Sequence, residues 1–314
     1  MPIDVISFGA LNIDLIYEGV IKEEGEDVMP QYFLERLLRF LGQPVSKSGG
    51  GSASNTVYAL SEMGFSTGLI GKVGIDGDFL ISGIGNVDVQ GVARGYGRSG
   101  HVVSMQHEDL RSMTIFPGEN DTLDESEIDL GYASDTRFIH MTSFVGDKPF
   151  HAQIYVARNV QPGVRISLDP GMLYVKARGL DGLVPLLDSA YILFVNEEEL
   201  WELSGKGVKE GCEYLLKRGH GTGPQIIACK LGKDGSFAMN KQGDYFEAKP
   251  ALVPATGQRY PTGTGDAYNA GFLAGLLLGE KLDRCATYGN ILGAKKLSVP
   301  REDFHPRLGD LKFQ

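Results

Sequence analysis

Short apolar segments alternate with helical ones through the second half of the chain, and this alternation limits the possible folds most. The apolar segments have the length and composition of buried strands, at 136–142, 164–169, 190–195 and 224–231. Strands joined by helices run parallel and are covered on both faces. With two earlier strands expected near 3–9 and 66–73, the pattern predicts an α/β fold with a mostly parallel central sheet.

Ligands of such sheets bind at the carboxyl ends of the strands, where this chain carries polar residues. One such end is Asn196–Glu199, in which Asn196 is a favourable N-cap and Glu199 completes a capping box. Alternatively, these two side chains, one helical turn apart, hold a hydrated Mg²⁺ ion that bridges phosphates. Both interpretations can hold at once.

A second strand end, 230–235, contains Lys230, Gly232 and Gly235. It is either a plain turn or a segment whose backbone contacts a flat or phosphorylated ligand. Asn290 is the only amide of a helix expected near 282–297, and it could meet a purine edge or face water.

The stretch 260–266, YPTGTGD, runs into an apolar helix at 267–278. Gly263, Thr264 and Gly265 can form a backbone nest whose N–H groups bind an anion at the helix N-terminus. Asp266 is then either a base that takes a proton from an attacking hydroxyl or an ordinary N-terminal cap. As a base, an aspartate with an ordinary pKa of about 3.9 is already ionised at neutral pH.

Two N-terminal stretches carry further polar candidates. In GALNID at 9–14, the side chains of Asn12 and Asp14 leave the same face of an extended chain. They are either a pair able to hydrogen-bond vicinal hydroxyls or an ordinary loop feature. In GGGSASN at 49–55, Gly50 and Gly51 let a ligand approach the backbone, and Asn55 projects from the first turn of a helix.

Two segments do not fit the strand and helix alternation. Residues 15–48 look like an insertion that includes a helix, and 94–118 read as a β-hairpin outside the main sheet, a possible lid. The glycine pattern at 95–100 matches a dinucleotide fingerprint, but it opens a strand, whereas the fingerprint must open a helix.

The overall charge points to small-molecule chemistry. With 314 residues, the chain can form one large α/β domain or two smaller ones. A net charge of -10 and a pI of about 5.1 argue against nucleic-acid binding. The three cysteines indicate neither disulfides nor a zinc site, and we expect a cytoplasmic protein without a leader or membrane span.

Taken together, these motifs resemble the ribokinase-like (PfkB) carbohydrate kinase family. Three features carry the resemblance: GALNID followed by GGSASNTVYALSEMG, then GLIGKVGIDGDF, and finally PTGTGDAYNAGFLAG, which is similar to the family signature DTxGAGDxFxxGF. The segments NEEE and KLGKDGSF lie where the family has its NxxE and TLGxxG motifs. The resemblance implies a three-layer α/β/α sandwich with a small β lid, as one kinase domain over 1–314 with lid segments at 15–48 and 94–118.

The resemblance also implies roles for the matching residues. Asp266 would be the base, and the backbone of Gly263, Thr264 and Gly265 would be the anion hole. Further residues would bind the acceptor (Asn12, Asp14, Gly50, Gly51, Asn55), the nucleotide (Asn196, Lys230, Gly232, Gly235, Asn290) and Mg²⁺ (Glu199, through water). A homodimer through the lid is expected from the same source.

Some residues depart from the family pattern. Tyr260 and Pro261 replace an Asp-Thr pair that often helps to build a monovalent-cation site, so potassium activation is in doubt. Ser52 stands where ribokinases proper have a lysine near the sugar, so ribose is not implied. The sequence therefore predicts an ATP- and Mg²⁺-dependent kinase for a hydroxyl of a sugar or sugar-like acceptor. A nucleoside kinase of the same fold and a non-catalytic metabolite sensor are the alternatives.

Overall fold

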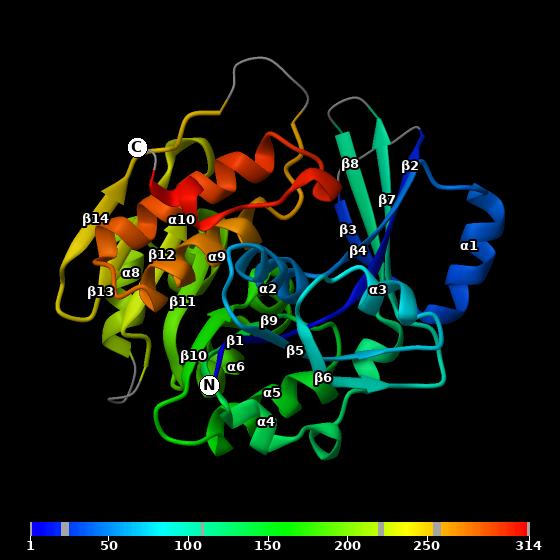
Figure 1. The fold of residues 1–314 in the computed structure, drawn as a ribbon, viewed down its shortest axis with the longest axis horizontal. Coiled ribbons are helices and arrows are strands. Elements are labelled where there is room, and N and C mark those ends of the chain that lie inside the picture. Colours follow the sequence, from blue (N-terminus) through cyan, green and yellow to red (C-terminus); the bar gives the residue numbers. More distant parts are fainter. Residues whose placement is uncertain (1, 20–24, 108–109, 219–222, 254–258, 313–314) are drawn as a thin grey trace.

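The computed structural model describes residues 2–19, 25–107, 110–218, 223–253 and 259–312. Within these residues the strands form one sheet of nine and one of five (Figure 1). The large sheet has helices on both of its faces. The small sheet stands at the side of the large one, with helix α1 (Leu34–Leu41) at its outer end.

The nine-stranded sheet is parallel except at one edge. In spatial order its strands are β14 (Tyr245–Ala248), β13 (Ser236–Asn240), β12 (Ile226–Lys230), β11 (Ala190–Asn196), β10 (Arg165–Asp169), β9 (Thr136–Thr142), β1 (Ile3–Phe8), β5 (Thr67–Val73) and β6 (Asp88–Arg94). Only β13 and β14 pair antiparallel with their neighbours. The predicted mostly parallel sheet is therefore confirmed.

Helices cover both faces of this sheet because its strands are apolar on both sides. Along β11, Ile192 and Phe194 enter one core while Leu193 and Val195 enter the other, which is the period-two alternation of a strand. One layer holds α2 (Ser52–Glu62), α9 (Thr264–Leu277) and α10 (Leu282–Leu297). The other holds α4 (Leu130–Ser134), α5 (Asp147–Asn159), α6 (Gly171–Leu187), α7 (Glu197–Ser204) and α8 (Val208–Arg218).

The five-stranded sheet, here called the lid sheet, combines two distant parts of the chain. Its strands, in spatial order, are β3 (Gly25–Val28), β8 (Leu110–Phe116), β7 (Gly100–His107), β2 (Asn12–Glu18) and β4 (Ser46–Gly50). Because β2 pairs with both β4 and β7, the lid sheet begins at Asn12, before the expected segment 15–48. The pattern at 95–100 leads into β7, as argued from the sequence.

The remaining elements are short. They are α3 (Asp78–Ser82) and 3₁₀ turns at Gln31–Phe33, Gly118–Thr122, Glu125–Glu127, Gly232–Asp234, Arg301–Asp303 and Leu308–Lys312. No helix in the described part of the chain combines the length and the apolarity that a membrane span requires.

Candidate active site

Asp266 lies in the first turn of α9, where the sequence predicted either a base or a helix cap. The N-cap is Gly263, in the left-handed conformation (φ 80°, ψ 4°), and no side chain caps the helix. The Asp266 carboxylate instead accepts a hydrogen bond of 2.7 Å from the Asn55 amide of α2. The capping alternative therefore fails, and the positive end of the helix dipole is directed at whatever binds there.

The surroundings of Asp266 change its proton affinity. Burial raises the pKa of Asp266, and the nearby Asp169 carboxylate adds to this, whereas the Asn55 hydrogen bond and the Lys230 ammonium act against it. The expectation of an ordinary pKa was wrong because Asp266 is only 9% exposed, which the sequence does not reveal. A raised pKa makes Asp266 a better acceptor for a hydroxyl proton.

The predicted anion nest is only partly directed at the site. Gly263 and Gly265 line the same cavity as Asp266. The Thr264 N–H and hydroxyl both donate to the Pro261 carbonyl, at 3.2 and 2.9 Å. The backbone N–H groups of the two glycines are therefore the better candidates for contact with an anion.

A cavity of about 330 Å³ lies between α9, α2 and the lid sheet. It is here called the acceptor cavity. Of the predicted acceptor residues, Asn12, Asp14, Gly51 and Asn55 line it. Gly50 lies beside it, where an added Cβ would overlap the Asp14 carboxylate. The structure thus brings together two N-terminal stretches and the start of α9.

Asn120 and Asp121, on the 3₁₀ turn after β8, also line this cavity and were not predicted. The Asn120 amide donates to Asn12 Oδ1 at 2.9 Å and also bridges the backbone N–H and C=O of Leu11. Asp121 accepts from the Gly146 N–H at 2.8 Å, and burial raises its pKa. No sequence motif marks these residues, because only the tertiary fold brings the turn after β8 to the site.

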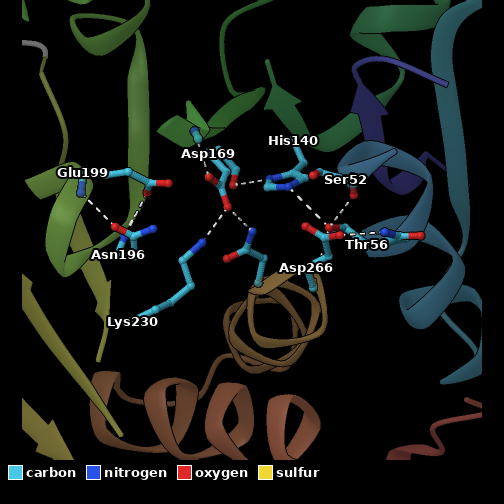
Figure 2. A network of polar contacts seen from close by, with 12 residues as sticks. Ser52, Thr56, His140, Asp169, Asn196, Glu199, Lys230 and Asp266 are labelled. Atoms are coloured by element: carbon cyan, nitrogen blue, oxygen red, sulfur yellow. Dashed lines mark hydrogen bonds and ion pairs between the residues drawn. The ribbon is translucent and has the colours of Figure 1, made fainter. Parts of the chain in front are cut away.

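A buried polar network continues from Asp266 toward β10, β11 and β12 (Figure 2). Asp169 Oδ2 accepts from Lys230 Nζ at 2.7 Å and from the Asn269 amide at 2.6 Å. Burial opposes the ionisation of Asp169, but the Lys230 ammonium outweighs it and lowers the pKa of this carboxyl. Burial lowers the pKa of His140, beside Asp169, to about 4, so its imidazole is neutral near pH 7. The sequence indicated Asp169 as the polar end of the strand expected at 164–169, but it assigned this residue no role.

Asn196 and Glu199 form the capping box expected of them. The Asn196 side chain accepts from the Glu199 N–H, and the Glu199 carboxylate accepts from the Asn196 N–H, each at 2.8 Å. Burial, together with the nearby Asp169 charge, raises the pKa of Glu199 to about 6. The capping interpretation is confirmed, and the Mg²⁺ role stays a prediction.

A second cavity, more open and of about 550 Å³, borders the first turn of α7. It is here called the open cleft. Asn196, Lys230 and Gly232 are the predicted nucleotide residues that line it. The other two, Gly235 and Asn290, both lie next to the backbone carbonyl of Ala248. A Cβ added to Gly235 would overlap this carbonyl, and the Asn290 amide donates a hydrogen bond of 3.1 Å to the same carbonyl. Nucleotide contact by Gly235 and Asn290 stays a prediction.

The residues present fit a Mg²⁺ ion that is only partly held by protein. The described residues include no cluster of three His, Cys, Asp or Glu side chains arranged for a metal. Mg²⁺ in phosphoryl-transfer sites usually takes one or two carboxylates, water and substrate phosphates. The buried carboxylate of Glu199, whose pKa is raised by burial and by the nearby Asp169 charge, is suited to that arrangement.

A buried carboxylate at a helix N-terminus, lining one cavity with an open cleft nearby, is compatible with a phosphotransferase that has an alcohol acceptor. Comparison with known proteins agrees with this class. Residues 4–302 match the pfkB family carbohydrate kinase profile. The chain therefore belongs to the PfkB family of carbohydrate kinases, and the ribokinase-like fold and the enzyme class predicted from the sequence are confirmed.

Individual relatives are similar over most of the chain. An uncharacterised sugar kinase of Archaeoglobus fulgidus is 34% identical over 242 residues, covering 75% of this chain and 93% of that protein. An ATP-dependent ribose-1-phosphate kinase of Halopiger xanaduensis is 30% identical over 263 residues, covering 82% of each. The crystal structure of Anopheles gambiae adenosine kinase with P1,P4-di(adenosine-5) tetraphosphate has a TM-score of 0.86 at 16% identity, covering 96% of this chain and 98% of that one.

Proposed function

We propose that the protein transfers the γ-phosphoryl group of ATP, with Mg²⁺, to a primary hydroxyl of an uncharged sugar or sugar-like acceptor. The observation that carries this proposal is the placement of Asp266. Asp266 is buried, its carboxylate is held by Asn55, and it lines the acceptor cavity together with Gly263 and Gly265. The name of the Halopiger relative supports ATP as the donor.

Different residues of the candidate site would perform the different steps of an in-line phosphoryl transfer. Asn12 and Asp14 orient the acceptor so that its hydroxyl meets Asp266, which takes the hydroxyl proton as the new O–P bond forms. The bond to the bridging oxygen of the β-phosphate breaks, and its electron pair leaves with ADP. The N–H groups of Gly263 and Gly265 stabilise charge on the transferring group. Bound Mg²⁺, held through Glu199 and water, would neutralise phosphate charge.

The charge of the acceptor cavity limits its substrate. Four carboxylates line it, those of Asp14, Glu26, Asp121 and Asp266. Among its described lining residues there is no Lys, Arg or His. An acceptor that carries a phosphate or carboxylate would be repelled by these carboxylates and would meet no basic side chain among the described lining residues. We therefore expect an uncharged acceptor, in contrast to the substrate in the name of the Halopiger relative.

A coupled ADP-release assay across matched acceptors tests the function and the charge preference together. We expect kcat/KM for a neutral sugar or nucleoside to exceed that of its phosphorylated counterpart by at least about 100-fold, equivalent to about 2.7 kcal/mol. Equal or better turnover of sugar phosphates would contradict the charge argument. No ADP release with any acceptor would favour the metabolite sensor, which the intact Gly263, Gly265 and Asp266 argue against.

A nucleoside acceptor is the second candidate because many residues that line the acceptor cavity are apolar. They are Val102, Met113, Ile115, Pro117, Phe144, Val145, Met172 and Leu173. A bare sugar offers little apolar surface to such a lining, whereas a nucleobase does. In the same assay, the second candidate predicts a lower KM for nucleosides than for the corresponding free sugars.

Substitution of Glu199 by Gln tests its role toward Mg²⁺. The amide oxygen of Gln can still accept from the Asn196 N–H, so we expect only a modest loss of stability. The Mg²⁺ concentration needed for half-maximal activity should rise several-fold. In the wild type the same requirement should rise as the pH falls through about 6, because protons compete for Glu199.

The control for Glu199→Gln is Glu127→Gln, which changes another capping-box glutamate that does not line the open cleft. Its Mg²⁺ requirement should not change. If Glu199→Gln alters only the melting temperature, the residue is a helix cap and nothing more.

The lid, the assembly and the location of the protein remain proposals as well. Closure of the lid sheet would exclude water from the acceptor cavity.

Large apolar side chains exposed near the lid sheet, including Tyr32 (74%) and Phe40 (86%), support a homodimer through the lid, which sedimentation of the full chain would test. We expect activity without potassium, and a cytoplasmic enzyme.

A further inference from the structure

Lys230 occupies the boundary between the open cleft and the acceptor cavity. It is the last residue of β12 and lines the open cleft together with Asn196. Its ammonium reaches the start of α9, where a Cβ built on Gly265 would lie 3.6 Å from Nζ. In Figure 2, Lys230 points toward Asp169, between Glu199 on one side and Asp266 on the other. A phosphoryl group passing from one cavity to the other would pass this ammonium.

Carboxylates keep this ammonium charged. The Lys230 side chain is 16% exposed, and burial alone would lower its pKa. The attraction of Asp169 and then of Glu199 outweighs burial, so the pKa of Lys230 lies above its usual value. Asp266 adds a smaller attraction. The site therefore contains a fixed positive charge beside the nest glycine Gly265.

The ion pair with Asp169 positions the Lys230 ammonium but uses only one of its three N–H donors. Asp169 Oδ2 is fixed by the Asn269 amide at 2.6 Å as well as by Lys230 at 2.7 Å. A lysine ammonium has three donors, and this bond uses one of them. Because desolvation often cancels the gain from a buried ion pair, stability is a weak reason for placing a lysine here.

We propose that Lys230 is a catalytic residue, whose ammonium contacts the phosphoryl group during transfer and stabilises its charge beside Gly265, with Asp169 as its positioning residue. This inference rests on the proposed kinase function and goes beyond nucleotide binding by Lys230. Lys230 forms no covalent bond and keeps its three protons. The phosphoryl group leaves the β-phosphate oxygen for the acceptor oxygen, and the hydroxyl proton goes to Asp266.

The test compares Lys230→Met with the wild type in the ADP-release assay. We expect kcat to fall about 10²–10³-fold, as when one donor to a transition-state charge is removed, with the KM for the acceptor changed less than about threefold. Lys72→Met is the matched control, because Lys72 is also buried and paired with a carboxylate, Glu127 at 2.8 Å. It should lose stability with kcat nearly unchanged.

Two further variants separate catalysis from folding. Lys230→Gln retains a donor for Asp169 but no charge, and it should fold and show the same loss of kcat if the Met variant does not fold. In Lys230→Ala, added ethylammonium should restore kcat at least tenfold without raising the melting temperature.

Retained kcat in Lys230→Gln, or a change confined to the KM for ATP, would overturn the inference. Loss of wild-type activity with every acceptor tested would overturn the proposed function instead.

Discussion

Replacement of Asp266 by Asn should reduce kcat about 10²–10⁴-fold, the range by which general-base catalysis accelerates a reaction. The amide oxygen of Asn can still accept the hydrogen bond from Asn55, so the local geometry should be preserved. What is lost is the group that takes the hydroxyl proton. Single-turnover measurements of ADP release by the full chain would isolate this step.

The stability of Asp266→Asn should change in the opposite direction to its activity. Because burial raises the pKa of Asp266, the folded state favours the protonated carboxyl, and this contribution is lost as the pH rises through the folded-state pKa. At neutral pH the charge is therefore unfavourable to folding, and the Asn variant should melt no lower than the wild type. Unchanged turnover in a well-folded variant would contradict the proposed mechanism.

The raised pKa also predicts the pH dependence of the wild-type enzyme. Protonation of Asp266 removes the base, so kcat should fall on the acidic side at a pH above the ordinary value for an aspartate. At saturating Mg²⁺, where protonation of Glu199 does not limit the rate, this acidic limb should be absent from the residual activity of Asp266→Asn.

Replacement of Gly51 by Ala should destabilise the fold and abolish most of the activity. Gly51 has φ 102° and ψ 130°, a conformation that costs a residue with a side chain about 1–3 kcal/mol. The new Cβ would also overlap the backbone carbonyl of Ala10, which lies between β1 and β2 and has little freedom to move. We expect about 1–3 kcal/mol more from this overlap, measured by urea unfolding.

Gly163→Ala is the matched control for this effect. Gly163 has a similar φ of 105°, but no atom lies within 4 Å of the position where its Cβ would stand. It should show the backbone strain alone and keep its activity. Equal destabilisation by the two substitutions would mean that close packing against Ala10 is unimportant.

The parallel strands β1, β5, β9, β10, β11 and β12 of the large sheet could be predicted because their signals are local, whereas the edge strands β6 and β14 were not predicted. The strand at 136–142 was predicted with the bounds that β9 has, and 190–195 differs from β11 by one residue at its end. The lid sheet was harder to define. Asn12 begins one of its strands because β2 pairs with Ser46–Gly50 and with β7, and pairing between distant segments leaves no mark on the local pattern.

The sequence by itself determined the main parallel strands and the family, and it indicated a candidate region for the reaction, since strand and helix periods and short glycine motifs depend on neighbouring residues. It thereby located Asp266 and the glycines beside it. Tertiary structure alone decided how they are held and charged: Asn55 contacts Asp266 across 211 positions, and Lys230 contacts Asp169 across 61. Packing of the layers sets these contacts and the burial that shifts each pKa.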